Sequence, residues 1–261
     1  MERFGEVSVE VGDDHVALVE IHRPPHNFFS LAMLGDLADA VEAVDADRDG
    51  RCILLATEGR NFCAGASLEK DRPRLTTAQA ERPDRHLYDE AVRLFSVATP
   101  VVAAVQGAAV GGGLGLACMA DLRVGGPGSR YTANFARLGF HHGFGLSVTL
   151  PAIVGQQRAL ELLYTGRRIK GEEAAAIGLV DRCVDDDRIR DEARLLAAEI
   201  AASAPLAVRS IKQTMRGHLP DAIRAATDRE KAEQERLSTT SDWLEGVAAM
   251  AERRPPRFTG S

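Results

Sequence analysis

The sequence predicts an α/β fold with a largely parallel sheet and a helical C-terminal region. Three observations lead to this class: an early pair of alternating apolar segments, short continuous apolar runs separated by helical patterns, and a last quarter that is helical almost throughout. Strand–helix–strand alternation favours right-handed parallel crossovers, and hence layers of helix on sheet. A chain of 261 residues is also long enough to bury a substantial core.

The predicted strands are of two kinds. The first two alternate around Gly12-Asp13-Asp14, which predicts an antiparallel hairpin. The next two are continuous apolar runs, typical of strands that are buried on both faces. The predicted strands cover residues 7–11, 15–22, 52–56, 101–105, 122–124 and 180–184.

Helical spacing of apolar residues recurs between and after these strands. Asp242 and Glu245 have the spacing of a capping box at the last helix. Residues 69–85 are polar and contain prolines, which predicts a mobile loop. We therefore expect a core over residues 1–200 and a helical oligomerisation region over 201–261. The predicted helices cover residues 31–47, 86–98, 113–119, 189–202, 206–217, 222–237 and 243–253.

The composition excludes several function classes. The formal net charge of −6 offers no electrostatic reason to bind nucleic acid. The charged start and the lack of a long apolar run predict a cytoplasmic protein with no membrane partner. The four cysteines are far apart and lack a CxxC pair, so we expect buried free thiols and no metal site.

Two turns of small residues are the strongest functional signal. Ala64-Gly65-Ala66 follows one buried strand, and Gly111-Gly112-Gly113 follows another and opens a helix. Small residues let backbone N–H groups approach a ligand closely, and a helix N-terminus adds unpaired donors and partial positive charge. Such turns suit an oxyanion or a phosphate. A dinucleotide fingerprint is excluded, because Leu116 stands where it needs glycine.

The two turns together resemble those of the crotonase (enoyl-CoA hydratase/isomerase) superfamily, and the likeness runs nearly end to end. The resemblance implies a spiral of ββα units, followed by a helical C-terminal region that packs trimers, which often pair into hexamers. The matching segments are 23–24, 62–66, 99–107, 111–114, 121, 160–171, 174–180, 245–246 and 253–258.

By the same resemblance, the backbone N–H groups of Ala66 and Gly112 form an oxyanion hole for an acyl-CoA thioester carbonyl. Fixed donors at that place stabilise the enolate that forms during reactions α or β to a thioester. The thioester is the substrate, so no separate cofactor is expected. The other positions implied in binding coenzyme A or the acyl chain are Pro25, His26, Ala64, Ser67, Leu68, Gly111, Phe135 and Arg253.

The sequence departs from the family at its acid–base positions. Hydratases of the family use two glutamates, which fall here on Gly115 and Phe135, and neither residue can transfer a proton. The single glutamate of the enoyl isomerases also falls on Phe135. The aspartate of dienoyl isomerases and aryl-CoA dehalogenases falls on Gly143. Phe135 with Phe140 and Phe144 predicts an apolar or aromatic acyl group instead.

His141 and His142 are the candidate replacements, because their loop is expected to face the acyl end and histidine has a near-neutral pKa. A solvent-exposed or subunit-contact role for either is the alternative. Glu69, Asp71 and the pair His86 and Tyr88 are further candidates from the predicted loop.

Three functions follow. The first is an acyl-CoA enzyme of fatty acid metabolism with altered proton-transfer groups, an isomerase, hydrolase, lyase or decarboxylase that acts on an unusual substrate. The second is a non-catalytic acyl-CoA-binding or assembly protein. The third is a conventional enoyl-CoA hydratase that recruits an acid from a loop.

Overall fold

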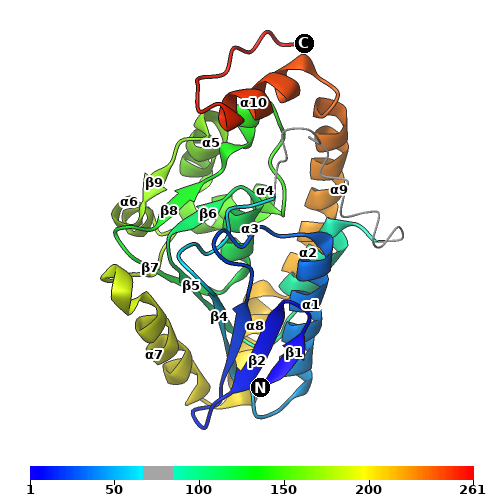
Figure 1. The fold of residues 1–261 in the computed structure, drawn as a ribbon. Helices are drawn as coiled ribbons and strands as arrows, with labels where there is room; N and C mark the ends of the chain where they lie inside the picture. The colour runs from blue at the N-terminus through cyan, green and yellow to red at the C-terminus, as the bar shows by residue number, and fades with distance from the viewer. Residues whose placement is uncertain (67–84) are drawn as a thin grey trace.

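A sheet in the order β1-β2-β3-β4-β5-β7-β10 forms the centre of the structure, a computed structural model that describes residues 1–66 and 85–261 (Figure 1). The strands β1, β2 and β3 pair antiparallel, and the following pairs are parallel. The α/β class is therefore confirmed. The bounds are β1 (Glu2–Phe4), β2 (Val7–Val11), β3 (Val16–Ile21), β4 (Cys52–Thr57), β5 (Val101–Val105), β7 (Leu122–Gly125) and β10 (Arg182–Cys183).

The predicted hairpin is present. Val7 pairs with Ile21 in register, and the Gly12 N–H closes the turn by donating to the Val16 carbonyl at 3.0 Å. Strand β1 extends this edge of the sheet and was not predicted, because three residues are too few to show a period.

The predicted two-sided burial is also confirmed. Within β4 and β5, Leu54 and Ala104 pack on the face covered by α7 (Ile189–Ala201). Ile53 and Ala103 pack on the opposite face, with α1 (Leu31–Ala46) and α2 (Leu87–Phe95). Successive side chains point to opposite faces of a strand, so an all-apolar run fits only between two layers.

A smaller sheet in the order β6-β8-β9 stands beside the first and was missed by the sequence analysis, because its strands have two or three residues. It leads into the helices that surround the central part of the molecule. These elements are β6 (Ala108–Val110), α3 (Gly112–Met119), β8 (Arg130–Thr132), the 3-10 helix η2 (Asn134–Leu138), α4 (Leu146–Val154), α5 (Gln156–Thr165), β9 (Ile169–Lys170) and α6 (Gly171–Ala176).

The C-terminal helices run from below the sheet to the top of the molecule (Figure 1). Helix α8 packs with its cationic side chains against the core, α9 packs on α2 and α4, and α10 packs on η2. The chain end lies beyond α10. The elements are the 3-10 helix η3 (Asp186–Arg188), α8 (Pro205–Arg216), α9 (Leu219–Leu237) and α10 (Ser241–Ala251).

The predicted capping box at α10 is wrong. Thr240 is the N-cap, and its hydroxyl accepts the Trp243 N–H at 3.2 Å. Asp242 instead accepts the Thr259 N–H at 2.7 Å, and Glu245 pairs with Arg254. The two carboxylates thus hold the last segment of the chain, a long-range role that local spacing does not indicate.

The structure also bears on the predicted thiols, the predicted loop and the expected lack of membrane spans. Cys52, Cys63 and Cys118 are buried and free, while Cys183 is half-buried. The predicted loop at 69–85 lies outside the described residues except for Arg85. In the described ranges, no helix is both long and apolar enough to cross a membrane.

Candidate active site

A cavity of about 500 Å³ opens between the two small-residue turns and the C-terminal helices. Its wall is built by the segment before α1, the turn after β4, the starts of α2 and α3, and η2 with the loop that follows. One residue of α9 and two of α10 complete it. Among the described residues, this lining contains no serine, cysteine, lysine or carboxylate side chain. Hydrogen bonding from neutral groups is therefore the chemistry that this part of the wall supplies.

The first turn is held in place by buried Asn27, which the sequence analysis did not single out. Its amide donates to the carbonyls of Glu58 at 2.9 Å and Asn61 at 2.7 Å, at the two ends of the segment that leaves β4. The Ala64 N–H then donates to the His26 carbonyl at 2.9 Å. These bonds fix the backbone just before Ala66, which lines the cavity.

The second turn starts α3. Gly111 has φ +56°, a conformation that favours glycine, and its N–H donates to the Thr132 carbonyl at 2.8 Å. Gly112 is the first helical residue, so its N–H has no intrahelical acceptor. Gly111 and Gly112 both line the cavity.

Backbone pairing holds the two turns side by side. The Val110 N–H donates to the Cys63 carbonyl at 3.0 Å, and the Cys63 N–H donates to the Ala108 carbonyl at 2.9 Å. Gly65 has φ +86°, and a Cβ there would lie 2.8 Å from the Val110 carbonyl oxygen and 4.0 Å from the Gly112 nitrogen. Within the described residues, the N–H groups of Ala66 and Gly112 have no hydrogen-bond acceptor. The structure thus brings two free backbone donors to one cavity.

The rest of the wall is mainly aromatic, as the phenylalanines near η2 predicted. Phe135, Phe140 and Phe144 all line the cavity, and the ring centroids of Phe140 and Trp243 lie 4.3 Å apart. Trp243 comes from α10, more than a hundred residues later in the chain. An apolar or aromatic group fits such a wall by area burial and ring packing.

Two of the three positions where the resemblance places carboxylates have no room for a side chain, and the third holds a phenylalanine. A Cβ on Gly115 would lie 2.6 Å from the Cβ of Phe144, so even alanine does not fit. Phe135 itself forms the wall. At Gly143, the place of a side chain is taken by the Tyr88 hydroxyl and by Gln234, whose Nε2 would lie 2.6 Å from a Cβ. At Gly115 and Gly143, neighbouring side chains therefore fill the space that a carboxylate side chain would need.

His141 and His142 do not line the cavity, against the expectation for their loop. Their rings stack with centroids 4.2 Å apart, and Nε2 of His142 is 2.8 Å from the Ser147 hydroxyl, which donates to buried Glu230. Burial, with a smaller effect of His141, lowers the pKa of His142 to about 4. The near-neutral pKa expected of this residue is therefore wrong.

Other polar side chains take the places expected of the histidine pair. His86 and Tyr88, the lesser candidates, both reach the cavity at the start of α2, while Glu69 and Asp71 lie outside the described residues. Gln234 of α9 also lines it, although its distance along the chain gave no signal. The Tyr88 hydroxyl donates to the Gln234 side chain at 2.8 Å. Burial raises the Tyr88 pKa, so the phenol stays neutral.

The positions implied in coenzyme A binding are only partly assembled. Pro25 and His26 are exposed beside the first turn, where the Asn61 amide donates to the Pro25 carbonyl at 2.9 Å. Ala64 lines the cavity itself. Arg253 is exposed beyond α10 and is not part of the lining. Ser67 and Leu68 lie outside the described residues.

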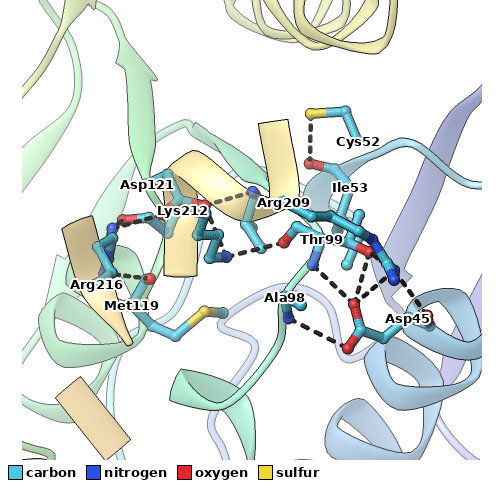
Figure 2. Close-up of polar contacts among 12 residues, drawn as sticks. Asp45, Cys52, Ile53, Ala98, Thr99, Met119, Asp121, Arg209, Lys212 and Arg216 are labelled. Atoms are coloured by element: carbon cyan, nitrogen blue, oxygen red, sulfur yellow. Dashed lines mark hydrogen bonds and ion pairs between the residues drawn. The ribbon is translucent and has the colours of Figure 1, made fainter. Parts of the chain in front are cut away.

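The far end of α3 is fixed by cations of α8, which Figure 2 shows, and by a cation of β7. Arg216 donates to the carbonyls of Met119 and Ala120, each at 3.0 Å, and pairs with Asp121 at 2.9 Å. Buried Arg123 donates to the Ala120 carbonyl at 2.8 Å. Lys212 also pairs with Asp121, at 2.9 Å. Cations at a helix C-terminus are stabilising, so this cluster anchors the helix that presents Gly112.

The sequence is similar to those of several known proteins. Residues 12–261 match the family model described as enoyl-CoA hydratase/isomerase. The chain is 32% identical over 252 residues to a 1,2-epoxyphenylacetyl-CoA isomerase of Escherichia coli, covering 94% of this chain and 95% of that protein. It is 33% identical to an enoyl-CoA isomerase/hydratase of Zymoseptoria tritici, over 94% of this chain and 84% of the relative.

Solved structures confirm the predicted crotonase fold. An enoyl-CoA hydratase/isomerase from Pseudoalteromonas atlantica superposes with a TM-score of 0.84 at 28% identity, over 97% of this chain and 100% of the other. An enoyl-CoA hydratase from Mycobacterium avium subsp. paratuberculosis gives a TM-score of 0.83 at 26% identity, over 98% and 99%. The chain therefore belongs to the enoyl-CoA hydratase/isomerase family.

Proposed function

We propose that the cavity binds an acyl-CoA thioester with its carbonyl oxygen between the N–H groups of Ala66 and Gly112. The observation that carries this proposal is the pair of free backbone donors at one cavity, one of them at the N-terminus of α3. The described lining supplies no carboxylate, so the proton that leaves the α-carbon is transferred to solvent water. Negative charge then develops on the carbonyl oxygen. Two fixed donors and a helix N-terminus stabilise the enolate without reorganising.

The acyl group that suits the wall is apolar or aromatic. Phe28 and Phe29 line the cavity together with the aromatic residues of the η2 region and α10. The E. coli relative is named for 1,2-epoxyphenylacetyl-CoA, a thioester with a cyclic acyl group, which agrees with a roomy apolar wall. The thioester is the substrate, and the reaction needs no further cofactor.

The proposed reaction class rests on the lack of carboxylates at Gly115, Phe135 and Gly143. Water addition by two glutamates has no counterpart at Gly115 and Phe135. An isomerase or lyase reaction that passes through the enolate fits better, because its main requirement is stabilisation of charge on the carbonyl oxygen. The conventional hydratase needs an acid from residues 67–84, and the non-catalytic binder needs none.

Two measurements on the purified protein test the proposal. Calorimetry with phenylacetyl-CoA and butyryl-CoA measures binding, and we expect both to bind, phenylacetyl-CoA more tightly. NMR in D₂O follows exchange of the α-protons, and we expect exchange above the rate without protein. Lack of binding by both thioesters would contradict the proposal. Binding without exchange would identify the non-catalytic binder, and rapid hydration of crotonyl-CoA would identify the hydratase.

A homotrimer, or a hexamer of two trimers, is the proposed assembly. Helix α8 uses its cationic side chains on the core, while Leu206, Ile211 and Met215 are exposed. An apolar helix face of this kind is typical of a subunit contact. Light scattering after gel filtration measures the mass, and a monomeric mass would contradict this part of the proposal.

A further inference from the structure

The His86 side chain is held in one orientation at the N-terminus of α2. It is the N-cap of this helix, and the Tyr88 N–H donates to its Nδ1 at 3.1 Å. Its own backbone N–H donates to the Asp89 carboxylate at 2.8 Å, which completes a capping box. The ring is therefore positioned by the start of the helix as well as by packing.

The capping bond also decides where the ring carries its proton. A ring nitrogen that accepts a hydrogen bond is unprotonated, so neutral His86 has its proton on Nε2. Nδ1 is occupied by the backbone, and Nε2 has no hydrogen-bond partner among the described residues. His86 lines the cavity, so its ring brings a free N–H donor to an otherwise aromatic wall.

Burial is the main reason that the ring stays neutral. Burial lowers the His86 pKa, and Lys231 on α9 lowers it further. Asp89 on α2 and Glu235 on α9 act in the opposite direction, with smaller effects. Tyr88, whose ring centroid lies 5.0 Å from that of His86, is neutral because its pKa is raised. The Nε2–H form therefore persists through neutral pH.

The neighbouring polar side chains are hydrogen-bonded to one another and to the loop before α4. The Tyr88 hydroxyl donates to the Gln234 carbonyl oxygen, and the Gln234 amide donates to the His141 carbonyl at 3.0 Å. This chain of bonds ties α2, α9 and the loop before α4 together. Among the described residues of this group, the His86 Nε2–H and the second amide N–H of Gln234 remain as donors for a ligand.

We propose that the Nε2–H of His86 donates a hydrogen bond to an oxygen atom on the acyl group, and so selects thioesters whose aromatic or apolar acyl group bears an acceptor oxygen. This inference rests on the proposed acyl-CoA function and adds the substrate class. Binding of the acyl group removes water from the Nε2–H, so an acyl group that cannot accept a hydrogen bond is bound less tightly. An acyl group without the oxygen leaves the N–H unpaired in an apolar wall.

The test compares phenylacetyl-CoA with its 2-, 3- and 4-hydroxyphenylacetyl counterparts by calorimetry at pH 7.5. We expect one or more of the hydroxylated esters to bind about threefold to tenfold more tightly than phenylacetyl-CoA, the usual worth of one hydrogen bond. In His86→Asn this advantage should fall below about twofold, while phenylacetyl-CoA binds nearly as before. Asparagine is a strong N-cap residue, so this variant keeps the start of α2.

His142→Asn is the matched control, because it also removes a half-buried imidazole but one that does not line the cavity. It should keep the full preference. A preference that survives His86→Asn, or that is absent from the wild type, would overturn the inference while leaving the proposed function intact. Failure of all four esters to bind would overturn both.

Nitrogen-15 NMR of the histidine rings gives a second readout that does not depend on the ester. The His86 ring should be the Nε2–H tautomer at neutral pH, with its Nδ1 signal characteristic of an acceptor. The Nδ1–H tautomer would overturn the inference, because Nε2 would then be an acceptor.

Discussion

The two ends of helix α3 are completed in opposite ways. At the C-terminal end, Arg123 and Arg216 satisfy the carbonyls of Met119 and Ala120, and Asp121 balances the added charge. At the N-terminal end, Gly112 offers an N–H that no described group accepts. The backbone groups at the C-terminal end of α3, the closed end, are thus hydrogen-bonded to side chains of the fold. At the N-terminal end, the open end, the Gly112 N–H is available at the cavity.

This difference indicates how the protein separates binding from proton transfer. The donors at the open end belong to the backbone, so substitutions around them leave them in place. Proton transfer in this family depends on side chains, and at those positions this chain has Gly115, Phe135 and Gly143. One part of the site is therefore retained and the other replaced. The following predictions test the two ends and the aromatic wall.

Gly112→Pro should have the largest effect, because it deletes the donor at the open end. Proline suits the first position of a helix, so α3 still forms. Loss of one oxyanion donor lowers the rate by about 10²- to 10³-fold. The rate of α-proton exchange of phenylacetyl-CoA in D₂O measures this loss.

Gly112→Ala is the control for that experiment. Both variants introduce a Cβ against the ring of Phe29, but alanine keeps the N–H. The alanine variant should therefore lose much less activity than the proline variant. Equal losses would mean that packing against Phe29, and not the donor, determines the rate.

Gly115→Glu should destabilise the fold instead of restoring a hydratase. The Cβ of Phe144 would lie 2.6 Å from the new Cβ, and the carboxylate would be buried without a partner. Overpacking and an unpaired buried charge together reduce the free energy of unfolding by about 3 kcal/mol or more. Urea denaturation measures this. A stable variant that hydrates crotonyl-CoA would show that the wall can accept the family's glutamate.

Acid should destabilise the protein partly through His142. Its pKa of about 4 in the folded state lies below the ordinary 6.5, so the unfolded chain binds more protons between these values. The stabilising contribution is complete above pH 6.5 and is lost as pH falls towards 4. At 1.36 kcal/mol per pKa unit, the loss is at most about 3 kcal/mol.

Urea denaturation of wild type and His142→Asn at pH 7 and pH 4 measures this contribution as a difference. The variant should lose less stability between the two pH values than the wild type. An equal loss in both proteins would place the acid sensitivity elsewhere.

Arg216→Met should show a smaller effect at the closed end of α3. The variant removes two hydrogen bonds to helix carbonyls, although Arg123 still satisfies Ala120. We expect the free energy of unfolding to fall by about 2 kcal/mol, the range for hydrogen bonds from charged groups. Arg254→Met removes an exposed ion pair with Glu245 and should change it by less than about 0.5 kcal/mol. Equal changes in the free energy of unfolding for the two variants would mean that the bonds of Arg216 to the α3 carbonyls add no more stability than an exposed ion pair.

Much of the fold could be predicted from local patterns. The hairpin, the two-sided strands β4 and β5, and the helices from α7 to α10 all have periods long enough to be recognised. The missed strands, such as β1 and β6, are too short to show a period. Helices α4 and α5 were missed as well, although they have nine and ten residues, and α4 consists mostly of apolar residues and so shows little amphipathic period. The capping box at Asp242 failed for a different reason, since its carboxylate bonds Thr259, a partner far along the chain.

The sequence by itself determined the two small-residue turns, the family and the absence of side-chain acids at Gly115, Phe135 and Gly143. These features depend on residue identity and order along the chain. Only the tertiary structure decided which side chains reach the cavity. His141 and His142 lie outside the lining, whereas His86, Tyr88 and Gln234 are part of it. Such neighbours are set by the packing of α2 against α9, and no local pattern encodes a contact between residues nearly 150 positions apart.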